Sequence, residues 1–503
     1  MKWLSLVGLV TLLLLTACSA HGPGQALTPS PLPPTVSATL PPSATPTNTA
    51  PVAPAATAAL PPEPTGVPIP ERPQYQLSAV LDYGWRTLQV EQRVVYPHHG
   101  SEALTEIWLL VQPNWYPGVF QLQELTWGDG SPVLAYSLQD IRLRLSLPAP
   151  LAPGEVVEFR LHYDLLLPEM LESDDFGPVP FGHTSRQINL TDWYPFVPPY
   201  IDGQGWLAHN TWFYGEHLVY PMADFEVEFR LENAPAVTMI AASTLDQGDD
   251  QVHRYRLLSG RSFVLSISPE YRVLHREVDG VHLFGYHFPL DAQAGEIAFQ
   301  AAVSAFQLYS QLFGAYPYES LSLVQADFKH GMEYQGLVFV SKGFYNAYQD
   351  SPESFLVTLA AHETAHQWWY GLVGNDPALE PWLDEALCTY SEHLFYEHYY
   401  PESLGWWKYA RLTYYEPQGW VDTSIYEAGG YRPYRDAVYL RGAQFLDELR
   451  LRMGDEAFFA FLQDYVARYS YRLASADNFF ELVAEHSSAN LTWTLEQYFQ
   501  HRR

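Results

Sequence analysis

The feature that most constrains this chain is the run His362-Glu363-Thr364-Ala365-His366. Two histidines four residues apart lie on one face of an α-helix, about one turn from each other, so both imidazoles can reach a single divalent ion. The intervening Glu363 projects beside them. The alternative is a pair of ordinary helical histidines next to a surface glutamate, because such a run arises by chance in roughly a few per cent of chains of this length. The run therefore predicts a helix and calls for a third ligand elsewhere.

A third ligand is expected because a catalytic zinc takes three nitrogen, sulfur or oxygen donors from the protein and keeps a fourth position open. Glu385 follows His366 after eighteen intervening residues, within Trp382-Leu383-Asp384-Glu385-Ala386. The stretch 374–377 between them consists of Gly, Asn, Asp and Pro, which predicts a turn. A second, antiparallel helix can then bring the carboxylate of Glu385 to the same ion.

A histidine as third ligand, in the pattern HExxHxxGxxH, is excluded because Trp369 and Leu372 stand at its positions. We therefore predict one Zn²⁺ per chain, held by His362, His366 and Glu385. Two histidines and a glutamate would also accept cobalt or manganese.

Residues 277–503 combine short strands with helices, which predicts an α+β unit. The expected strands are 281–287, 321–326 and 337–340. The expected helices include 292–313, 352–372, 381–398, 455–469 and 475–486. The helix that carries the two histidines should have Ser351 as N-cap and Pro352 in its first turn, with Gly371 and Gly374 marking its end.

Residues 74–276 show the alternation of apolar and polar side chains that is typical of β-strands. The clearest runs are 88–90, 141–145, 157–161 and 225–229. Clusters of Gly and Pro separate these runs, and no helical period or internal repeat is present. We expect a single antiparallel sandwich or saddle-shaped sheet. The aromatic segment 189–222 is expected either to line a cleft or to pack beneath a long loop.

The N-terminus carries an apolar run from Trp3 to Ala17 that is too short to span a bilayer and predicts an export signal at 1–17. The sequence Leu15-Thr16-Ala17-Cys18 resembles a lipobox, in which the cysteine is acylated; the alternative is an ordinary cleavage site with a chance cysteine. Residues 18–73 are rich in Pro, Thr and Ala and predict a tether. The sequence therefore predicts an exported cell-envelope lipoprotein, held at a membrane through Cys18 only.

The charge balance excludes several classes of partner. The chain has 27 Lys and Arg against 57 Asp and Glu, a net charge of −30, which argues against nucleic acid and anionic membrane surfaces. A neutral or cationic partner is expected. Two cysteines cannot form a disulfide framework, and Cys388, one turn beyond Glu385, is expected to pack in a helix interface.

The spacing HExxH-x18-E, the Trp-Leu-Asp-Glu-Ala sequence and the run Gly331-Met332-Glu333 together resemble the alanyl aminopeptidase (aminopeptidase N) family of gluzincins. The exopeptidase signature of that family is Gly-x-Met-Glu-Asn followed shortly by Gly. Gly331, Met332, Glu333 and Gly336 fit it, whereas His330 replaces its first Gly and Tyr334 replaces its Asn, which leaves the shape of the substrate subsite and the substrate preference open.

The resemblance implies that Glu333 binds the free α-amine of the substrate, since an ammonium in a partly dry cleft needs a paired carboxylate. The alternative is a solvated carboxylate at a strand edge. Gln187, just before the aromatic segment, is the candidate from the β-region for the same role. Tyr439, in Val438-Tyr439-Leu440-Arg441-Gly442-Ala443, is similar to the tyrosine that donates to the developing oxyanion in the family.

Tyr431 and Tyr434 are the alternatives to Tyr439. The family also implies a saddle-shaped β-domain before a thermolysin-like catalytic domain with C-terminal helices, in the order read from the periodicity. It implies that zinc activates a water molecule while Glu363 takes the water's proton and passes it to the leaving amine. Because the chain ends at Arg503, without room for the large helical domain of longer relatives, a more open cleft is expected.

Three functions follow as hypotheses. The first is an aminopeptidase that removes N-terminal residues from peptides with a free N-terminus outside the cytoplasm. The second is a zinc endopeptidase or oligopeptidase using the same site. The third is a surface protein that binds peptides without cleaving them. The sequence predicts neither the oligomeric state nor the side of the envelope.

Overall fold

The computed structural model describes residues 72–170, 180–249, 251–329 and 331–501. The predicted export signal (1–17), nearly all of the predicted tether (18–73) with Cys18, and His330 lie outside these ranges. Within them, no helix combines the length and the apolar character needed to cross a lipid bilayer.

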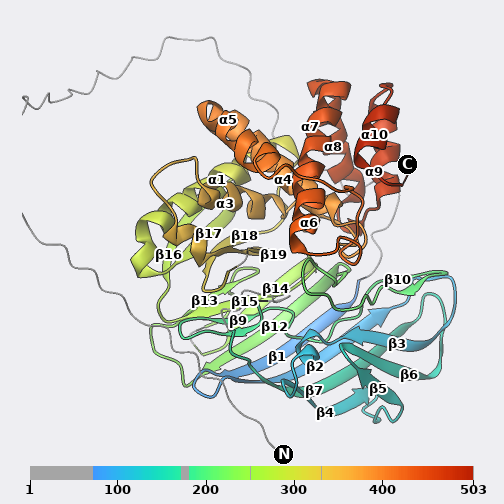
Figure 1. Cartoon of the computed structure of the whole chain (residues 1–503). Coiled ribbons are helices and arrows are strands. Elements are labelled where there is room, and N and C mark those ends of the chain that lie inside the picture. Colours follow the sequence, from blue (N-terminus) through green and yellow to red (C-terminus); the bar gives the residue numbers. More distant parts are fainter. Residues whose placement is uncertain (1–71, 171–179, 250, 330, 502–503) are drawn as a thin grey trace, which may run out of the picture. The chain divides into compact units, whose positions relative to one another are not determined.

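The first part of the chain folds into β-sheets (Figure 1). Its strands are β1 (Gln74–Asp82), β2 (Thr87–Pro97), β3 (Leu104–Leu110), β4 (Phe120–Trp127), β5 (Tyr136–Gln139), β6 (Arg142–Leu151), β7 (Val156–Leu166), β8 (Gly182–His183), β9 (Ile188–Leu190), β10 (Tyr200–Ile201), β11 (Gly205–Trp206), β12 (Ala223–Glu232), β13 (Met239–Ala242), β14 (His253–Gly260) and β15 (Leu265–Ser268). A short 3₁₀ turn, η1 (Gln112–Trp115), follows β3. Three main sheets result, in the orders β14-β12-β1-β2-β7-β4, β3-β6-β5 and β13-β15-β9-β8.

The expected antiparallel pairing holds in these sheets with one correction. In the described part of the domain, β1 and β12 form a parallel ladder in which Gln74 faces Asp224. Neighbours joined by a tight turn must run antiparallel, but these strands are separated by more than a hundred residues. The long connection leaves their relative direction free.

The alternation of side chains places one face of each strand in a shared core. Leu77 in β1, Leu88 in β2 and Leu161 in β7 are buried, and they belong to the same apolar cluster as Ile107 in β3 and Leu143 in β6. The six-stranded and three-stranded sheets thus pack face to face, which gives the predicted sandwich.

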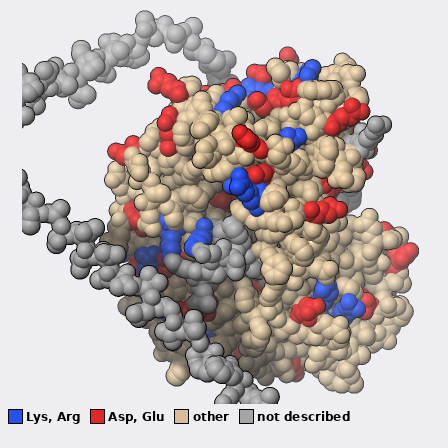
Figure 2. Space-filling model, in the orientation of Figure 1, with Lys and Arg blue, Asp and Glu red and all other residues tan. Residues whose placement is uncertain are grey.

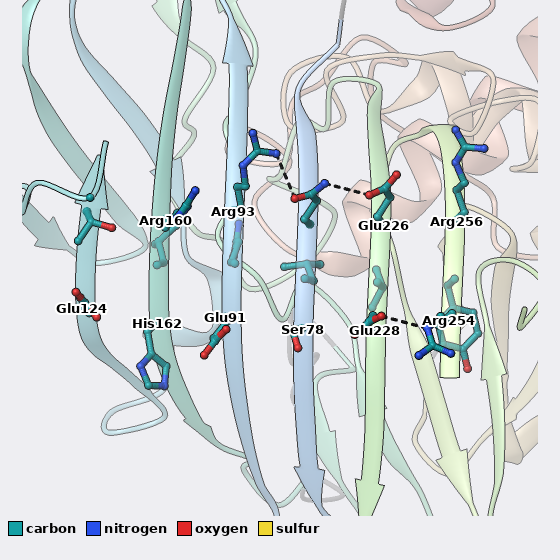
Figure 3. A pocket seen from close by; sticks show the side chains of 18 of the residues that line it. Ser78, Glu91, Arg93, Glu124, Arg160, His162, Glu226, Glu228, Arg254 and Arg256 are labelled. Atoms are coloured by element: carbon teal, nitrogen blue, oxygen red, sulfur yellow. Dashed lines mark hydrogen bonds and ion pairs between the residues drawn. The ribbon is translucent and has the colours of Figure 1, made fainter. Parts of the chain in front are cut away.

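The opposite face of the six-stranded sheet is a broad polar groove (Figure 3). Its charged side chains pair across neighbouring strands: Arg254 Nε donates to Glu228 Oε1 at 3.1 Å, and Gln76 Nε2 donates to Glu226 Oε2 at 3.0 Å. Exposed pairs of this kind contribute about 0–1 kcal/mol each. The groove contains none of the predicted site residues, and its alternation is that of a solvated sheet face.

The second part of the chain is built on a five-stranded sheet. Its strands are β16 (Arg272–Val278), β17 (Val281–His287), β18 (Ser320–Ala326), β19 (Met332–Tyr334) and β20 (Leu337–Ser341), in the order β16-β17-β18-β20-β19. β17, β18 and β20 run parallel, and β16 and β19 pair antiparallel at the two edges. The predicted domain boundary at 276 falls inside β16, so this sheet begins slightly earlier, at Arg272.

Helices cover this sheet and extend to the C-terminal end. They are α1 (Ala292–Leu312), α2 (Lys342–Asn346), α3 (Phe355–Ala365), α4 (Trp382–Tyr399), α5 (Leu404–Trp407), α6 (Tyr431–Arg435), α7 (Gly442–Met453), α8 (Asp455–Tyr469), α9 (Ala476–His486) and α10 (Thr492–Tyr498). Two π-helical segments, η4 (Lys408–Thr413) and η5 (Asp436–Arg441), and two 3₁₀ turns, η2 (Pro289–Asp291) and η3 (Pro401–Ser403), lie among them, and a two-residue ladder joins β21 (Val373–Gly374) to β22 (Arg472–Leu473). In Figure 1, α1, α3 and α4 lie on the same side of the five-stranded sheet.

The predicted strands and helices of this part agree with the observed ones, apart from the ends of the histidine-bearing helix. That helix, α3, begins at Phe355 with Ser354 as N-cap, whose side chain accepts from the amide of Leu356, and not at Ser351. It ends at Ala365, with His366 as C-cap, several residues before Gly371. The chain turns away at His366 because the following residues form a sharp turn.

The acidity of the chain is distributed over its surface. Figure 2 shows Asp and Glu side chains scattered over the visible face rather than gathered into one patch. This distribution is that of a solvated surface.

Candidate active site

The three predicted metal ligands converge at the ends of α3 and α4. Nε2 of His362 lies 3.2 Å from Oε2 of Glu385 and 3.2 Å from Nε2 of His366, and the third separation, from His366 to Glu385, is 3.5 Å. Ligands placed 2.0–2.1 Å from a tetrahedral zinc lie about 3.4 Å apart. The three donor atoms therefore fit a zinc ion.

Backbone geometry orients His366. The residue caps α3, and its Nδ1 donates to the carbonyl of Trp369 at 3.2 Å in the turn that follows. A hydrogen bond at Nδ1 fixes the tautomer that leaves Nε2 with its lone pair for a metal. Because α3 ends at Ala365, the turn that follows can hold the His366 ring in the orientation a metal ligand needs.

His362 is oriented by a buried glutamate that the sequence reasoning missed. Nδ1 of His362 lies 2.8 Å from Oε1 of Glu392. Glu392 also accepts from Nε of Arg411 at 2.9 Å and from Nε1 of Trp407 at 2.9 Å. A signal existed, because Glu392 follows Glu385 by two helical turns on the same face of α4. The sequence contained no such signal for Arg411, because this residue lies on the separate segment η4.

The site shifts the pKa values of Glu385 and Glu363 in opposite directions. Burial tends to raise the pKa of Glu385, but hydrogen bonds from His362 and His366 outweigh it and lower that pKa to about 2. Burial raises the pKa of Glu363 to about 7, although the two histidines pull it down. Glu385 is therefore a permanently ionised ligand, and Glu363 exchanges protons near neutrality.

Glu363 has one oxygen free to act. Its side chain is 5% exposed, and Oε2 has no hydrogen-bond partner among the described residues. Oε1 approaches Gly331 so closely that a Cβ there would lie 2.2 Å from it. Gly331 is therefore required for the position of Glu363, a role that the sequence did not indicate.

Tyr439 lies at the metal ligands, as predicted. Its hydroxyl donates to Oε1 of Glu385, and its ring lies nearly parallel to that of His362, with centroids 6.1 Å apart. Tyr434 packs against Tyr439 and its buried hydroxyl has no partner among the described residues. The hydroxyl of Tyr434 therefore makes no hydrogen bond to the three ligands within the described chain.

Glu333 faces the metal ligands from the edge strand β19. Carboxylate oxygens of Glu333 and Glu363 and a ring nitrogen of His366 lie within 4.8 Å of one another. Glu333 is 6% exposed, so it is not the solvated strand-edge carboxylate of the alternative interpretation. The two-residue turn at Gln335 and Gly336 holds it there by joining β19 to β20.

A second carboxylate, Glu216, reaches the same place from the aromatic segment of the β-domain. Oxygens of Glu216, Glu333 and Glu385 also lie within 4.8 Å of one another, and Oε2 of Glu216 has no partner among the described residues. Burial raises the pKa of both Glu216 and Glu333 well above the ordinary value; the charge of Glu216 raises the pKa of Glu333 further, and the charge of Glu385 raises that of Glu216. Nothing in the sequence around Glu216 marked it as a site residue.

Gln187 does not reach this group. Its amide is buried, with Nε2 donating to the hydroxyl of Tyr271 at 2.5 Å and to the carbonyl of Gln325 at 3.0 Å, while Oε1 accepts from the amide of Asp327 at 2.8 Å. These bonds occupy the side chain in the contact between β9 and the end of β18. The structure therefore places Gln187 away from the metal ligands, whereas Glu216 of the β-domain lies beside them.

A small cavity adjoins these residues, with about 30 Å³ of space for molecules the size of water. It is lined by Asp192, Glu216, His217, Leu218, Tyr220, Met332, Glu333, Tyr334, Tyr370, Pro377 and Asp384. Met332 thus lines the cavity, and Tyr334, at the Asn position of the family signature, donates to Asp192 at 2.9 Å. Cys388 is fully buried among apolar side chains, in agreement with a packing role.

Comparisons with known proteins agree with this geometry. Residues 297–498 match the peptidase family M1 domain. The chain is similar to aminopeptidase M1-D of Oryza sativa subsp. japonica, 27% identical over 224 residues, which are 40% of this chain and 26% of the relative. It is also similar to aminopeptidase N of Lactobacillus delbrueckii subsp. lactis, 23% identical over 290 residues, or 54% of this chain and 34% of that protein. The chain thus spans about a quarter to a third of these relatives.

Solved structures with the same fold include an M1 zinc metallopeptidase from Deinococcus radiodurans. A mutant of it superimposes with a TM-score of 0.61 at 21% identity, covering 86% of this chain and 95% of that chain. A second structure of that enzyme, described as bound to a Tyr-Ser-Ala substrate, gives a TM-score of 0.60. The likeness shows a shared two-domain fold.

A histidine pair on one helix, completed by a glutamate from the next, distinguishes gluzincins among zinc peptidases. The three ligands of this chain have that arrangement, and zinc is the cofactor that they fit. Residues 297–498 are similar to the peptidase family M1 domain, and the similar curated proteins are aminopeptidases.

Proposed function

We propose that the protein is an aminopeptidase that removes single residues from the free N-terminus of peptides. The observation that carries the proposal is the position of Glu216 and Glu333 beside the metal ligands. One oxygen of each lies within 4.8 Å of an oxygen of Glu385; Glu333 is buried and Glu216 is half-buried. Two such carboxylates favour a bound ammonium.

The short distance selects the first peptide bond. In an amino acid the carbonyl carbon lies about 2.5 Å from the α-nitrogen, and each further residue adds up to roughly 3.5 Å. An amine held between Glu216 and Glu333 therefore brings the carbonyl of its own residue to the metal ligands. An endopeptidase would need the opposite, an opening at this point for the preceding residues of its substrate.

The side chains then have separate tasks. Glu216 and Glu333 hold the amine and fix the register of the peptide. Zinc bound by the three ligands supplies Lewis acidity at the scissile carbonyl and lowers the pKa of a water molecule. Glu363, through its unpartnered Oε2, accepts the proton of that water and delivers it to the leaving amine. Tyr439, whose hydroxyl lies beside Glu385, offers a neutral hydrogen-bond donor where negative charge develops.

The names of the relatives support the proposal, since the similar curated proteins are aminopeptidases and the neighbouring structure is described with a tripeptide substrate. We further propose that the enzyme works outside the cytoplasm as a lipoprotein anchored at Cys18. The support is the apolar run and the small residues before this cysteine. Replacement of Cys18 by Ser should move the protein from the membrane fraction to the soluble fraction.

The test is a paired assay with aminoacyl anilides and their N-acetylated forms. The aminopeptidase proposal predicts hydrolysis of the free-amine substrates alone, loss on chelation and recovery on addition of zinc. Equal hydrolysis of acetylated and free substrates would instead indicate an endopeptidase. Zinc binding without hydrolysis of any substrate would indicate a peptide-binding protein.

A further inference from the structure

The turn between β19 and β20 connects the amine site to the metal site. Glu333 lies on β19, which has three residues and forms one edge of the five-stranded sheet. β19 therefore has a neighbouring strand on one side only, and the turn at Gln335 and Gly336 joins it to that neighbour, β20. The position of Glu333 relative to the metal ligands depends on the contacts that hold this turn.

Gln367 holds the turn from the side of the metal site. It is fully buried and follows His366, the ligand that caps α3. Nε2 of Gln367 donates to the carbonyl of Tyr334 at 3.1 Å, and Oε1 accepts from the amide of Gly336 at 2.9 Å. One side-chain amide thus bonds the main chain on both sides of Gln335.

The partners of this amide determine its orientation. Oε1 of Gln367 also accepts from the hydroxyl of Tyr316 at 3.3 Å, so the oxygen faces N–H and O–H groups and the nitrogen faces a carbonyl. A reversed amide would bring its NH₂ group against the amide of Gly336 and its oxygen against the carbonyl of Tyr334. Gln367 can therefore make both main-chain bonds in one orientation only.

The β-domain supports the turn on its other side. A Cβ at Gly336 would lie 2.0 Å from the carbonyl oxygen of Ser243, and the φ of 72° at this position also favours glycine. The hydroxyl of Tyr334 donates to Asp192 of the β-domain at 2.9 Å. The turn is thus held from two sides, and the bonds of Gln367 are its support on the side of the metal ligands.

These bonds join direct chain neighbours of two site residues. Gln367 follows the ligand His366, and Tyr334 follows Glu333. Consecutive Cα atoms are about 3.8 Å apart across a planar peptide bond, so a shift of Tyr334 moves Glu333 with it. A carboxylate oxygen of Glu333 lies within 4.8 Å of a ring nitrogen of His366. The contact made by Gln367 therefore controls the separation between the amine site and the metal site.

We infer that Gln367 is a positioning residue of the amine site, whose side-chain amide holds β19 at the distance from the metal ligands that a bound N-terminal residue requires. The inference rests on the proposed aminopeptidase function and adds to it a residue that acts through Glu333. An amine held at the wrong distance would misplace the carbonyl of its own residue, and a misplacement of about 1 Å can cost on the order of 10²-fold in rate.

The test measures how much the amine contributes to binding. Alanine hydroxamate carries an α-amine and a metal-binding hydroxamate, and propionohydroxamic acid is the same molecule without the amine. Calorimetry on the zinc-loaded protein gives the Kd of each. The wild type should bind alanine hydroxamate about 10–100-fold more tightly, as expected for hydrogen bonds between carboxylates and a charged amine.

Gln367→Met removes both main-chain bonds and nearly preserves the volume of the side chain. The ratio of the two Kd values should fall at least about fivefold, because the amine no longer meets Glu333 at the right distance. The zinc content and the Kd of propionohydroxamic acid, which binds through the metal alone, should stay as in the wild type. The kcat/KM for an alanine anilide should fall together with the ratio.

Gln325→Met is the matched control. Gln325 is fully buried in β18, where its Oε1 accepts from the amide of Phe288 at 2.7 Å and its Nε2 donates to Asp291 at 2.7 Å. The same substitution therefore removes a buried amide and leaves one main-chain N–H unpaired, as in Gln367→Met. It should lower the melting temperature by a similar amount and leave the ratio of the two Kd values unchanged.

The outcomes separate the two proposals. Equal Kd values of the two hydroxamates in the wild type would overturn the amine site, and the inference with it. An unchanged ratio in folded, zinc-loaded Gln367→Met would overturn the inference alone, as would an equal fall in Gln325→Met. Loss of zinc, or equal weakening of both ligands, would show that Gln367 supports the metal ligand instead. If Gln367→Met does not fold, the milder Gln367→Asn, whose side chain is too short for both bonds, is judged by the same ratio.

Discussion

Glu392 and Arg411 form a fully buried ion pair directly behind the metal site, with two hydrogen bonds of 2.7 and 2.9 Å between the guanidinium and the carboxylate. The same carboxylate lies 2.8 Å from His362. Arg411 on η4 therefore helps to orient the ligand His362 on α3 through the side chain of Glu392 on α4.

Removing this support should weaken the metal site in two distinguishable ways. Glu392→Gln should lower zinc affinity by about 10–100-fold, because His362 loses a charged partner at Nδ1. Arg411→Met should instead cost about 3–5 kcal/mol of folding free energy, because it leaves the Glu392 carboxylate buried and unpaired. Competition with a chelator measures the first effect and denaturant unfolding measures the second. Unaltered zinc affinity in Glu392→Gln would contradict the role given to this residue.

Substitutions at the motif should separate metal binding from proton transfer. Glu363→Gln is expected to keep one zinc per chain and lose about 10²–10⁴-fold in kcat, since its oxygen is not a ligand in this geometry. His362→Ala should lose zinc and activity together. Metal analysis beside the anilide assay distinguishes the two, and appreciable turnover in either variant would refute the assignment.

Gly331→Ala should disable Glu363 without removing the metal. The new Cβ would lie 2.2 Å from Oε1 of Glu363 and 3.2 Å from the carbonyl of Phe339, so the carboxylate must move. A misplacement of about 1 Å can cost on the order of 10²-fold in rate. The control is Gly405→Ala, where a Cβ meets no atom within 4 Å. Equal kcat values in the two variants would show that Gly331 does not constrain the base.

Ionisation of Asp192 has a consequence for stability. Burial raises the pKa of Asp192 to about 6, although hydrogen bonds from Tyr220 and Tyr334 oppose the shift. Because the folded state holds its proton more tightly than the unfolded chain, the contribution of Asp192 to the free energy of unfolding falls as pH rises from about 4 to about 6. Asp192→Asn should therefore lose this part of the pH dependence. Thermal unfolding of the wild type and the variant at pH 4.5 and 7 measures the difference.

The sequence predicted the metal ligands and the chain order of the two domains, because both depend on local periodicity. The spacing of His362 and His366 on a helix, and of Glu385 on the next, needs nothing from distant residues. The ends of α3 were less predictable, since the turn at His366 is fixed by contacts such as its bond to Trp369.

What the sequence could not predict comes from the β-domain or from distant helices. Glu216, Asp192 and Arg411 reach the site only through tertiary packing, and their sequence neighbours carry no pattern. Gln187 was chosen for its place before the aromatic segment, but the pairing of β9 with β15 turns it into a buried amide network. Sequence position cannot tell such residues apart when the chain between them is irregular.

The origin of Glu216 and Asp192 outside residues 297–498 separates two properties of the enzyme. The ligands that hold zinc belong to the segment shared with the M1 relatives, whereas both acids lie in the irregular segment 189–222 of the β-domain. Substitutions in that segment can change which peptides are bound without altering the residues that cleave the peptide bond. The substrate preference of such an enzyme can change while its catalytic centre stays the same.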